Sequence, residues 1–200
     1  MTVVEYKVTV DNDYTKNTTW RLNGVIHRDG GPAITNRFGE YEWFQHGVHH
    51  RDDGPAIMNR TAGTRYMVNG VLHREDGPAI KRSDGSEYWY LNGKRHREDG
   101  PAVYVPSMDI QYWVHGKLHN ISGPAIWEYN GTREWWVNGD RHSIVGPALI
   151  LPDGTKEYWI YGVQITKNEF NEKIRQWRGE KPLMPPFPSP MDNHNSAHDT

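Results

Sequence analysis

Hydrophobic and polar positions along this chain recur with a period of 23 residues. A glycine closes each aromatic-rich segment, and it returns at Gly24, Gly47, Gly70, Gly93, Gly116, Gly139 and Gly162. A histidine keeps the same step at His27, His50, His73, His96, His119 and His142. A proline does so at Pro32, Pro55, Pro78, Pro101, Pro124 and Pro147. Periods of roughly 20 to 50 residues are typical of repeat proteins, in which each repeat packs against its neighbours.

Each repeat contains two segments that alternate as β-strands do, and residues 78–91 show both. One begins at Pro78-Ala-Ile80, and the other is the aromatic-rich Glu87–Leu91. Asp84-Gly85 lies between them, and this dipeptide is a strong signal for a two-residue hairpin turn. Such a turn places Arg82 opposite Glu87, which is a stabilising opposite-charge pair. The same register predicts these further pairs: Glu128 with Arg133, Ile57 with Tyr66, Ile80 with Trp89, Ile126 with Trp135 and Leu149 with Tyr158.

The connection between successive hairpins, Asn-Gly-x-x-His-Arg-x-Asp-Gly-Pro, contains two glycines and a proline and is therefore predicted to be a loop. The whole pattern predicts an all-β fold. It is an elongated single-layer antiparallel meander of about seven β-hairpin repeats with one C-terminal α-helix.

Four regions follow from this pattern. Residues 1–19 alternate as strands without the full motif, and predict a degenerate capping hairpin. Residues 20–165 hold the repeats. Thr166-Lys-Asn-Glu169 is a capping box, so residues 166–178 are predicted to form a helix that caps the last repeat. Residues 179–200 are rich in proline and then in polar side chains, which predicts a disordered tail.

Composition narrows the function classes. The net charge is −2, so no strong field directs the chain to nucleic acid or to an anionic membrane. Cysteine is absent, which excludes disulfides and zinc sites built on thiolates. No segment is long and apolar enough to span a bilayer, and the N-terminus is charged where a signal peptide needs an apolar run. We therefore expect a soluble, cytoplasmic protein.

The histidine ladder suggests metal binding at first sight, but its spacing argues against it. Two strands per repeat, at about 4.8 Å per strand, put successive histidines roughly 10 Å apart. A zinc ion lies about 2 Å from each ligand, so neighbouring ladder histidines cannot share one. We predict that each histidine fixes its corner by hydrogen bonds to the backbone or to the following acid. No metal and no cofactor is predicted, although His46, His49 and His50 form a local cluster where a weak site stays an alternative.

The residues after the ladder histidines change along the chain. In four repeats an arginine is followed by an acid within three residues, which predicts ion pairs: Arg28, Arg51, Arg74 and Arg97 with Asp29, Asp53, Asp76 and Asp99. In the last two repeats Ile121, Ile144 and Val145 replace this charged group. Either the C-terminal helix or a partner covers these apolar side chains, and the helix is the favoured cover.

Aromatic residues occupy both faces of the predicted sheet. The core face carries Trp20, Trp43, Tyr66, Trp89, Tyr112, Trp135 and Tyr158. The opposite face carries Phe44, Met67, Tyr90, Trp113, Trp136 and Trp159, framed by polar residues. A sheet with one solvated face needs only one apolar face. The second face is therefore either a binding surface, together with Ile121 and Ile144, or it is buried; both alternatives stay open.

Signatures of catalysis are missing from the sequence. It has no phosphate-binding glycine loop, no Gly-x-Ser-x-Gly elbow and no His-Glu-x-x-His motif. The carboxylates recur in identical repeat environments, which do not separate two pKa values as an acid–base pair requires. We predict that the protein is not an enzyme and has no catalytic residue.

The segment from Tyr88 to His96, Tyr-Trp-Tyr-Leu-Asn-Gly-Lys-Arg-His, preceded by Asp84-Gly85, resembles the MORN repeat and its bacterial relatives, the MORN-like antitoxins. The variant His-Arg-x-Asp-Gly-Pro-Ala also resembles repeat proteins of large bacteriophages and giant viruses. This resemblance covers roughly Trp20 to Phe170 and implies a scaffold or binding surface. The inserted Arg-x-Asp and the Pro-Ala depart from ordinary MORN units, so lipid binding is not carried over.

Together these features predict a non-catalytic repeat scaffold that binds another protein. The resemblance implies a phage- or bacteria-encoded inhibitor, similar to an antitoxin, that acts on a host defence or toxin protein. The alternatives are a protein that sequesters a small ligand such as a nucleotide or sugar, or a structural virion component. Membrane binding is not expected and nucleic acid is disfavoured. The N-terminal strand, Val4–Val10, has an open edge through which a homodimer could form.

Overall fold

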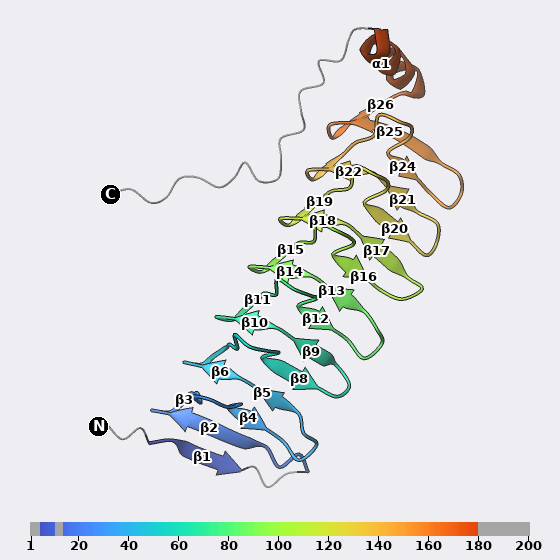
Figure 1. The fold of residues 1–200 in the computed structure, drawn as a ribbon. Helices are drawn as coiled ribbons and strands as arrows, with labels where there is room; N and C mark the ends of the chain where they lie inside the picture. The colour runs from blue at the N-terminus through green and yellow to red at the C-terminus, as the bar shows by residue number, and fades with distance from the viewer. Residues whose placement is uncertain (1–4, 11–13, 180–200) are drawn as a thin grey trace, which may run out of the picture. The chain divides into compact units, whose positions relative to one another are not determined.

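Residues 5–10 and 14–179 are described by a computed structural model (Figure 1). The predicted disordered tail lies outside these residues, as does part of the predicted N-terminal strand. The chain divides into two compact units. Unit 1 comprises Met1–His96 with Ala102–Pro106, and unit 2 comprises Arg97–Pro101 with Ser107–Thr200.

Unit 1 is an antiparallel meander whose main-sheet strands follow one another in sequence order. These strands are β1 (Lys7–Val10), β2 (Thr18–Leu22), β4 (Ile34–Thr35), β5 (Tyr41–Glu42), β8 (Ile57–Asn59), β9 (Gly63–Arg65), β12 (Ile80–Lys81), β13 (Glu87–Tyr88) and β16 (Val103–Tyr104). Short hairpins form a second row beside them (Figure 1). They are β6 (Phe44–Gln45) with β7 (Val48–His49), β10 (Met67–Val68) with β11 (Val71–Leu72), and β14 (Tyr90–Leu91) with β15 (Lys94–Arg95); β3 (Val25–Ile26) pairs with β2. Strand β1 begins the sheet path, at its edge.

Unit 2 repeats this arrangement. Its main-sheet strands are β17 (Asp109–Gln111), β20 (Ile126–Glu128), β21 (Arg133–Glu134), β24 (Leu149–Ile150), β25 (Lys156–Ile160) and β26 (Val163–Ile165). Its short hairpins are β18 (Trp113–Val114) with β19 (Lys117–Leu118) and β22 (Trp136–Val137) with β23 (Asp140–Arg141). The predicted all-β meander with one C-terminal helix is confirmed.

Helix α1 (Lys167–Gly179) closes unit 2 and begins at the predicted capping box. The Thr166 N–H donates to Glu169 Oε2 at 2.7 Å, and the Glu169 N–H donates to Thr166 Oγ1 at 3.2 Å. The helix packs on β25 through Phe170, which is only 6% exposed and lies 5.0 Å from the Tyr158 ring. These contacts cover the apolar end of the last repeat.

The predicted Asp-Gly turn is wrong by one residue. Among residues 83–85, all of them described, only Gly85 has positive φ (85°), whereas a two-residue type I′ turn needs two such residues. The loop therefore contains three residues, and the Arg82 N–H donates to the Ser86 carbonyl at 2.9 Å. The Asp84 carboxylate holds this shape by accepting the Ser86 N–H at 2.8 Å.

This extra loop residue shifts every predicted pair. Lys81, not Arg82, faces Glu87, with 3.3 Å between Nζ and Oε1. The other corrected pairs are Ile80 with Tyr88, Ile57 with Arg65, Ile126 with Glu134, Trp127 with Arg133 and Leu149 with Glu157. A one-residue change of register moves each partner to the opposite face. The aliphatic residues therefore share a face with polar residues and Tyr88, not with the repeat aromatics.

The connection predicted to be a loop contains the two-residue hairpin turn instead. Asn69 and Gly70 have φ values of 50° and 78°, as a type I′ turn requires. Val68 faces Val71 directly across this turn. The sequence contains both Asp-Gly and Asn-Gly steps, and in this repeat it is the Asn-Gly step that forms the tight turn.

A narrow core runs where each main-sheet strand meets its short hairpin. The repeat aromatic stands at this bend: the Trp43 N–H donates to the Ala56 carbonyl at 2.7 Å, and its own carbonyl accepts the His50 N–H at 3.1 Å. The alanine after each repeat proline is completely buried, which leaves no room for a larger side chain: Ala33, Ala56, Ala79, Ala102, Ala125 and Ala148.

Candidate functional site

The ladder histidines join successive corners through their ring nitrogens. His50 Nδ1 accepts the backbone N–H of Asn69 at 3.1 Å, and its Nε2 lies 3.3 Å from Asp52. The equivalent backbone bonds join His27 to His46, His73 to Asn92, His119 to Asn138 and His142 to Tyr161. The predicted hydrogen bonds to the backbone are present at these five positions. Burial lowers the pKa of His119 and His142, because desolvation disfavours their charged forms.

The three histidines that formed a cluster in the sequence have different partners. His46 stacks on His27 at 4.6 Å, and His49 Nε2 lies 2.7 Å from Glu42. His50 is occupied by Asn69 and Asp52, as described above. The ring nitrogens of these three histidines therefore do not converge on one point, as a shared metal ion would require.

The repeat arginines stabilise the corners. Arg51 lies 4.2 Å over the Trp43 ring, and its Nε donates to Asp53 at 2.7 Å. Arg74 pairs in the same way with Asp76, and Arg97 with Asp99. The predicted ion pair does not hold at Arg28, which lies over Trp20 and donates to the Pro32 carbonyl. Asp29 instead accepts a hydrogen bond from Tyr6 and lies beside His27. Each of these four arginines therefore already contacts groups of its own corner.

The six predicted residues of the second aromatic face are all half-buried: Phe44, Met67, Tyr90, Trp113, Trp136 and Trp159. The three tryptophans share one local geometry, in which the indole Nε1–H donates to the residue two positions earlier. The acceptors are Gln111 at 3.0 Å, Glu134 at 2.9 Å and Glu157 at 2.8 Å. These rings are therefore fixed in orientation and remain partly accessible.

Arg141 connects two of these tryptophans, and sequence reasoning missed it. Its guanidinium lies 5.0 Å from the Trp136 ring and 5.1 Å from the Trp159 ring. It donates to Glu134 at 2.7 Å and lies 3.6 Å from Glu157. Trp136 and Arg141 face each other in the short hairpin. The Asn-Gly turn between them could have revealed this pair, had it been recognised as a hairpin turn.

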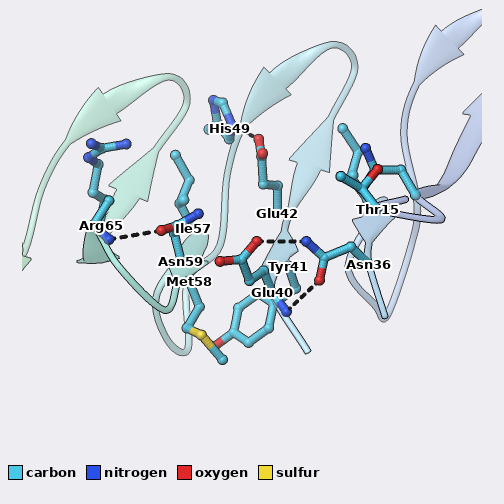
Figure 2. A pocket seen from close by; sticks show the side chains of 13 residues that line it. Thr15, Asn36, Glu40, Tyr41, Glu42, His49, Ile57, Met58, Asn59 and Arg65 are labelled. Atoms are coloured by element: carbon cyan, nitrogen blue, oxygen red, sulfur yellow. Dashed lines mark hydrogen bonds and ion pairs between the residues drawn. The ribbon is translucent and has the colours of Figure 1, made fainter. Parts of the chain in front are cut away.

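Unit 1 contains a groove of about 510 Å³, lined by Thr15, Asn17, Ile34, Asn36, Glu40, Tyr41, Glu42, His49, Ile57, Met58, Asn59, Ala62 and Arg65. Figure 2 shows that Glu42 and His49 meet, and that Glu40 turns to Asn36. Glu40 also accepts the Arg60 N–H at 3.0 Å. No ion pair to Arg65 occurs among the residues that the structure describes. The groove therefore carries a cation and an imidazole–carboxylate pair two strands apart, with Ile57 between them.

Two apolar residues of the last two corners remain exposed, contrary to the prediction that helix α1 covers them. Ile121 is 73% exposed and Val145 is 83% exposed, whereas Ile144 is half-buried. The helix packs on β25 and leaves these corners open. Asn120 stands where other repeats have arginine, and it makes the equivalent bond: its Nδ2 donates to the Pro124 carbonyl at 3.0 Å.

No protein-family model matches the chain, and no curated protein matches it significantly. The resemblance to MORN repeats accordingly remains a prediction. Within residues 5–10 and 14–179, no helix has the length and apolar character that crossing a bilayer requires.

Proposed function

We propose that this chain is a non-catalytic repeat scaffold that binds another protein through the last two corners of unit 2. The exposure of Ile121 and Val145 carries this proposal. The same repeat positions hold acids elsewhere, such as Glu75 and Asp76. Replacing solvated charges with exposed aliphatic side chains is unfavourable in water, and such surfaces are typical of protein interfaces.

The local structure supports a preformed interface. Asn120 Oδ1 accepts the Ser122 N–H at 2.9 Å, and Ser143 Oγ accepts the Val145 N–H at 3.4 Å. These bonds hold the backbone on which the apolar side chains stand. Binding then costs little ordering of the loops, so more of the contact energy contributes to affinity.

The resemblance to MORN-like antitoxins favours one form of this function. In that form the partner is a host defence or toxin protein, and binding inhibits it. The fixed aromatic side chains at Trp113, Trp136 and Trp159 would add rigid contact surface of the kind enriched at binding hot spots.

Affinity capture with a charge-restoring variant tests the proposal. Ile121→Glu combined with Val145→Asp introduces the acids found at these repeat positions elsewhere, so the fold is expected to be retained. We expect the wild-type chain to retain a partner that this variant loses, by at least tenfold in recovered amount. Asp52→Asn, at another exposed corner, is the control and should capture the partner as the wild type does. Equal capture by the corner variant would contradict the proposal.

The groove of unit 1 supports a second candidate, the binding of a small ligand such as a nucleotide or sugar. The observation that favours it is a concave site in which the half-buried Arg65 and the Glu42–His49 pair lie on one face of the sheet, with Ile57 between them. Thermal-shift measurements with nucleotides and sugars test it. A ligand of this groove should raise the melting temperature of the wild type and not that of Arg65→Ala. A shift of equal size in both proteins would place the ligand elsewhere.

A further inference from the structure

One row of side chains across the unit 2 sheet consists of cations and apolar groups. Five residues lie opposite one another across consecutive strands: Ile110, Trp127, Arg133, Ile150 and Lys156. This set is called the basic row. Arg133 and Lys156 are exposed, and Trp127 is 46% exposed. The strands that carry it, β17, β20, β21, β24 and β25, follow one another in Figure 1.

The acids of these strands lie on the opposite face. Glu134 faces Ile126 and Leu149, and Glu157 faces Leu149, each one position removed from the basic row. Asp109 and Glu128 face each other on that side as well. Because side chains alternate along a strand, the sheet separates its charges by face. Among the described residues, no ion pair forms with Arg133 or Lys156.

The equivalent row of unit 1 is balanced in charge. There, Thr64 faces Lys81, Lys81 faces Glu87 and Glu87 faces Tyr104. The Lys81–Glu87 ion pair measures 3.3 Å. The basic row is thus a property of unit 2 and not a general consequence of the repeat.

We infer that the basic row is an interaction surface for an acidic, amphipathic helix of a partner protein. This rests on the proposed protein-binding function and adds the chemistry of the partner. Arg133 and Lys156 stand two strand spacings apart, roughly 10 Å. Acids seven residues apart on a helix are separated by about the same distance, roughly 10.5 Å, and an apolar side chain between them meets Ile150.

Trp127 provides the apolar anchor beside these charges. Arg133 lies 4.4 Å over its ring, which orients the indole before any partner binds. Tyr129, 77% exposed, and Met108, 57% exposed, flank the same strands and extend the apolar surface. Exposed aromatic and apolar groups with unpaired cations complement a helix that presents acids and leucines on one face.

A protein partner fits this surface better than nucleic acid does. A nucleic acid strand presents a phosphate at every nucleotide and is bound through several cations. The basic row supplies two cations, and the four acids on the other face of the same sheet weaken its positive potential. Short-range pairing with two carboxylates is compatible with this limited charge.

Fluorescence anisotropy with purified full-length chain tests the inference. The probe is a labelled 20-residue helical peptide with glutamates seven residues apart and leucines between them. We expect saturable binding at 50 mM salt, weakened at least fivefold at 500 mM salt because the charges are screened. Arg133→Gln with Lys156→Gln should weaken binding at least tenfold, and Lys156→Glu alone should weaken it similarly. Lys81→Gln, at the balanced row of unit 1, is the matched control and should bind as the wild type does.

Three results would overturn the inference: no peptide binding, equal binding by the double variant, or tighter binding of a 20-nucleotide oligothymidylate than of the peptide. Circular dichroism verifies that each variant is folded. The Ile121→Glu, Val145→Asp variant separates the two proposals, because its corners lie outside the basic row. If this corner variant binds the peptide and also captures the same proteins as the wild type, only the corner proposal fails. If corner-dependent capture persists while the peptide does not bind, the basic row fails alone.

Discussion

His50 Nδ1 accepts the backbone N–H of Asn69 at 3.1 Å, so a ring in one repeat holds the tight turn of the next. Asn69 has a φ of 50°, which ordinary residues adopt at a cost. The acceptor, His50, lies 19 residues before Asn69 in the sequence, so the bond joins two segments that are distant along the chain. The histidine ladder is therefore a device that couples neighbouring repeats.

Replacing His50 with alanine should destabilise the fold. The Asn69 N–H loses its acceptor and the ring leaves a small cavity, so we expect the free energy of unfolding to fall by about 2 kcal/mol. His49→Ala is the control. That ring pairs with a partly exposed Glu42, and its loss should cost less than about 1 kcal/mol. Urea denaturation measures both values, and equal losses would show that the backbone bond contributes nothing special.

Stability should fall as the pH drops below the ordinary histidine range. Burial lowers the pKa of His119 and His142 below the usual value of 6.5, so the folded state binds fewer protons than the unfolded state. This contribution to stability is complete above pH 6.5 and decreases as the pH falls toward the lowered pKa values.

Urea midpoints measured at pH 8 and pH 5 test this sign. The wild type should have the lower midpoint at pH 5, and His142→Gln should show a smaller difference between the two pH values. A midpoint independent of pH, or one that rises on acidification, would contradict the assignment.

Gly77 leaves room for a guanidinium that lies beside it. A Cβ at Gly77 would lie 2.7 Å from the Arg74 guanidinium carbon, and Arg74 lies 3.9 Å over the Tyr66 ring. Gly77→Ala should displace Arg74 and lower the free energy of unfolding by about 1 kcal/mol. Gly146→Ala, which meets nothing within 4 Å, should be close to neutral. Adding Arg74→Ala should remove the penalty at Gly77; a penalty that persists would place its cause in the backbone.

Arg141 and its two carboxylate partners, Glu134 and Glu157, should contribute to stability together. Arg141→Ala leaves Glu134 and Glu157 half-buried without their cation, so a loss of about 2–4 kcal/mol is expected. In the preceding repeat, Gln111 and Leu118 occupy the positions of Glu134 and Arg141. Arg141→Leu with Glu134→Gln and Glu157→Gln should therefore recover most of the lost stability. Thermal and urea unfolding compare the two variants, and a triple variant as unstable as Arg141→Ala would show that the ion pairs are not the cause.

The sequence by itself determined the repeat, the approximate positions of the main-sheet strands, the hydrogen bonding of the histidines to the backbone and the start of helix α1 at Thr166. These features follow from local chemistry: alternation along a strand, the hydrogen-bonding capacity of an imidazole and the capping box. They recur or act within a few residues, so no distant contact is needed to infer them.

Tertiary structure decided the register, the joining of Trp136 to Trp159 by Arg141 and the exposure of Ile121. The prediction placed the tight turn at Asp84-Gly85 and a loop at Asn92-Gly93, but only the second pair has two residues with positive φ. Strand pairing on either side fixes that difference, because one loop residue changes which side chains meet. Ile121 is exposed because α1 packs on β25, and the position of a helix on a sheet depends on the sum of many distant contacts rather than on any local pattern.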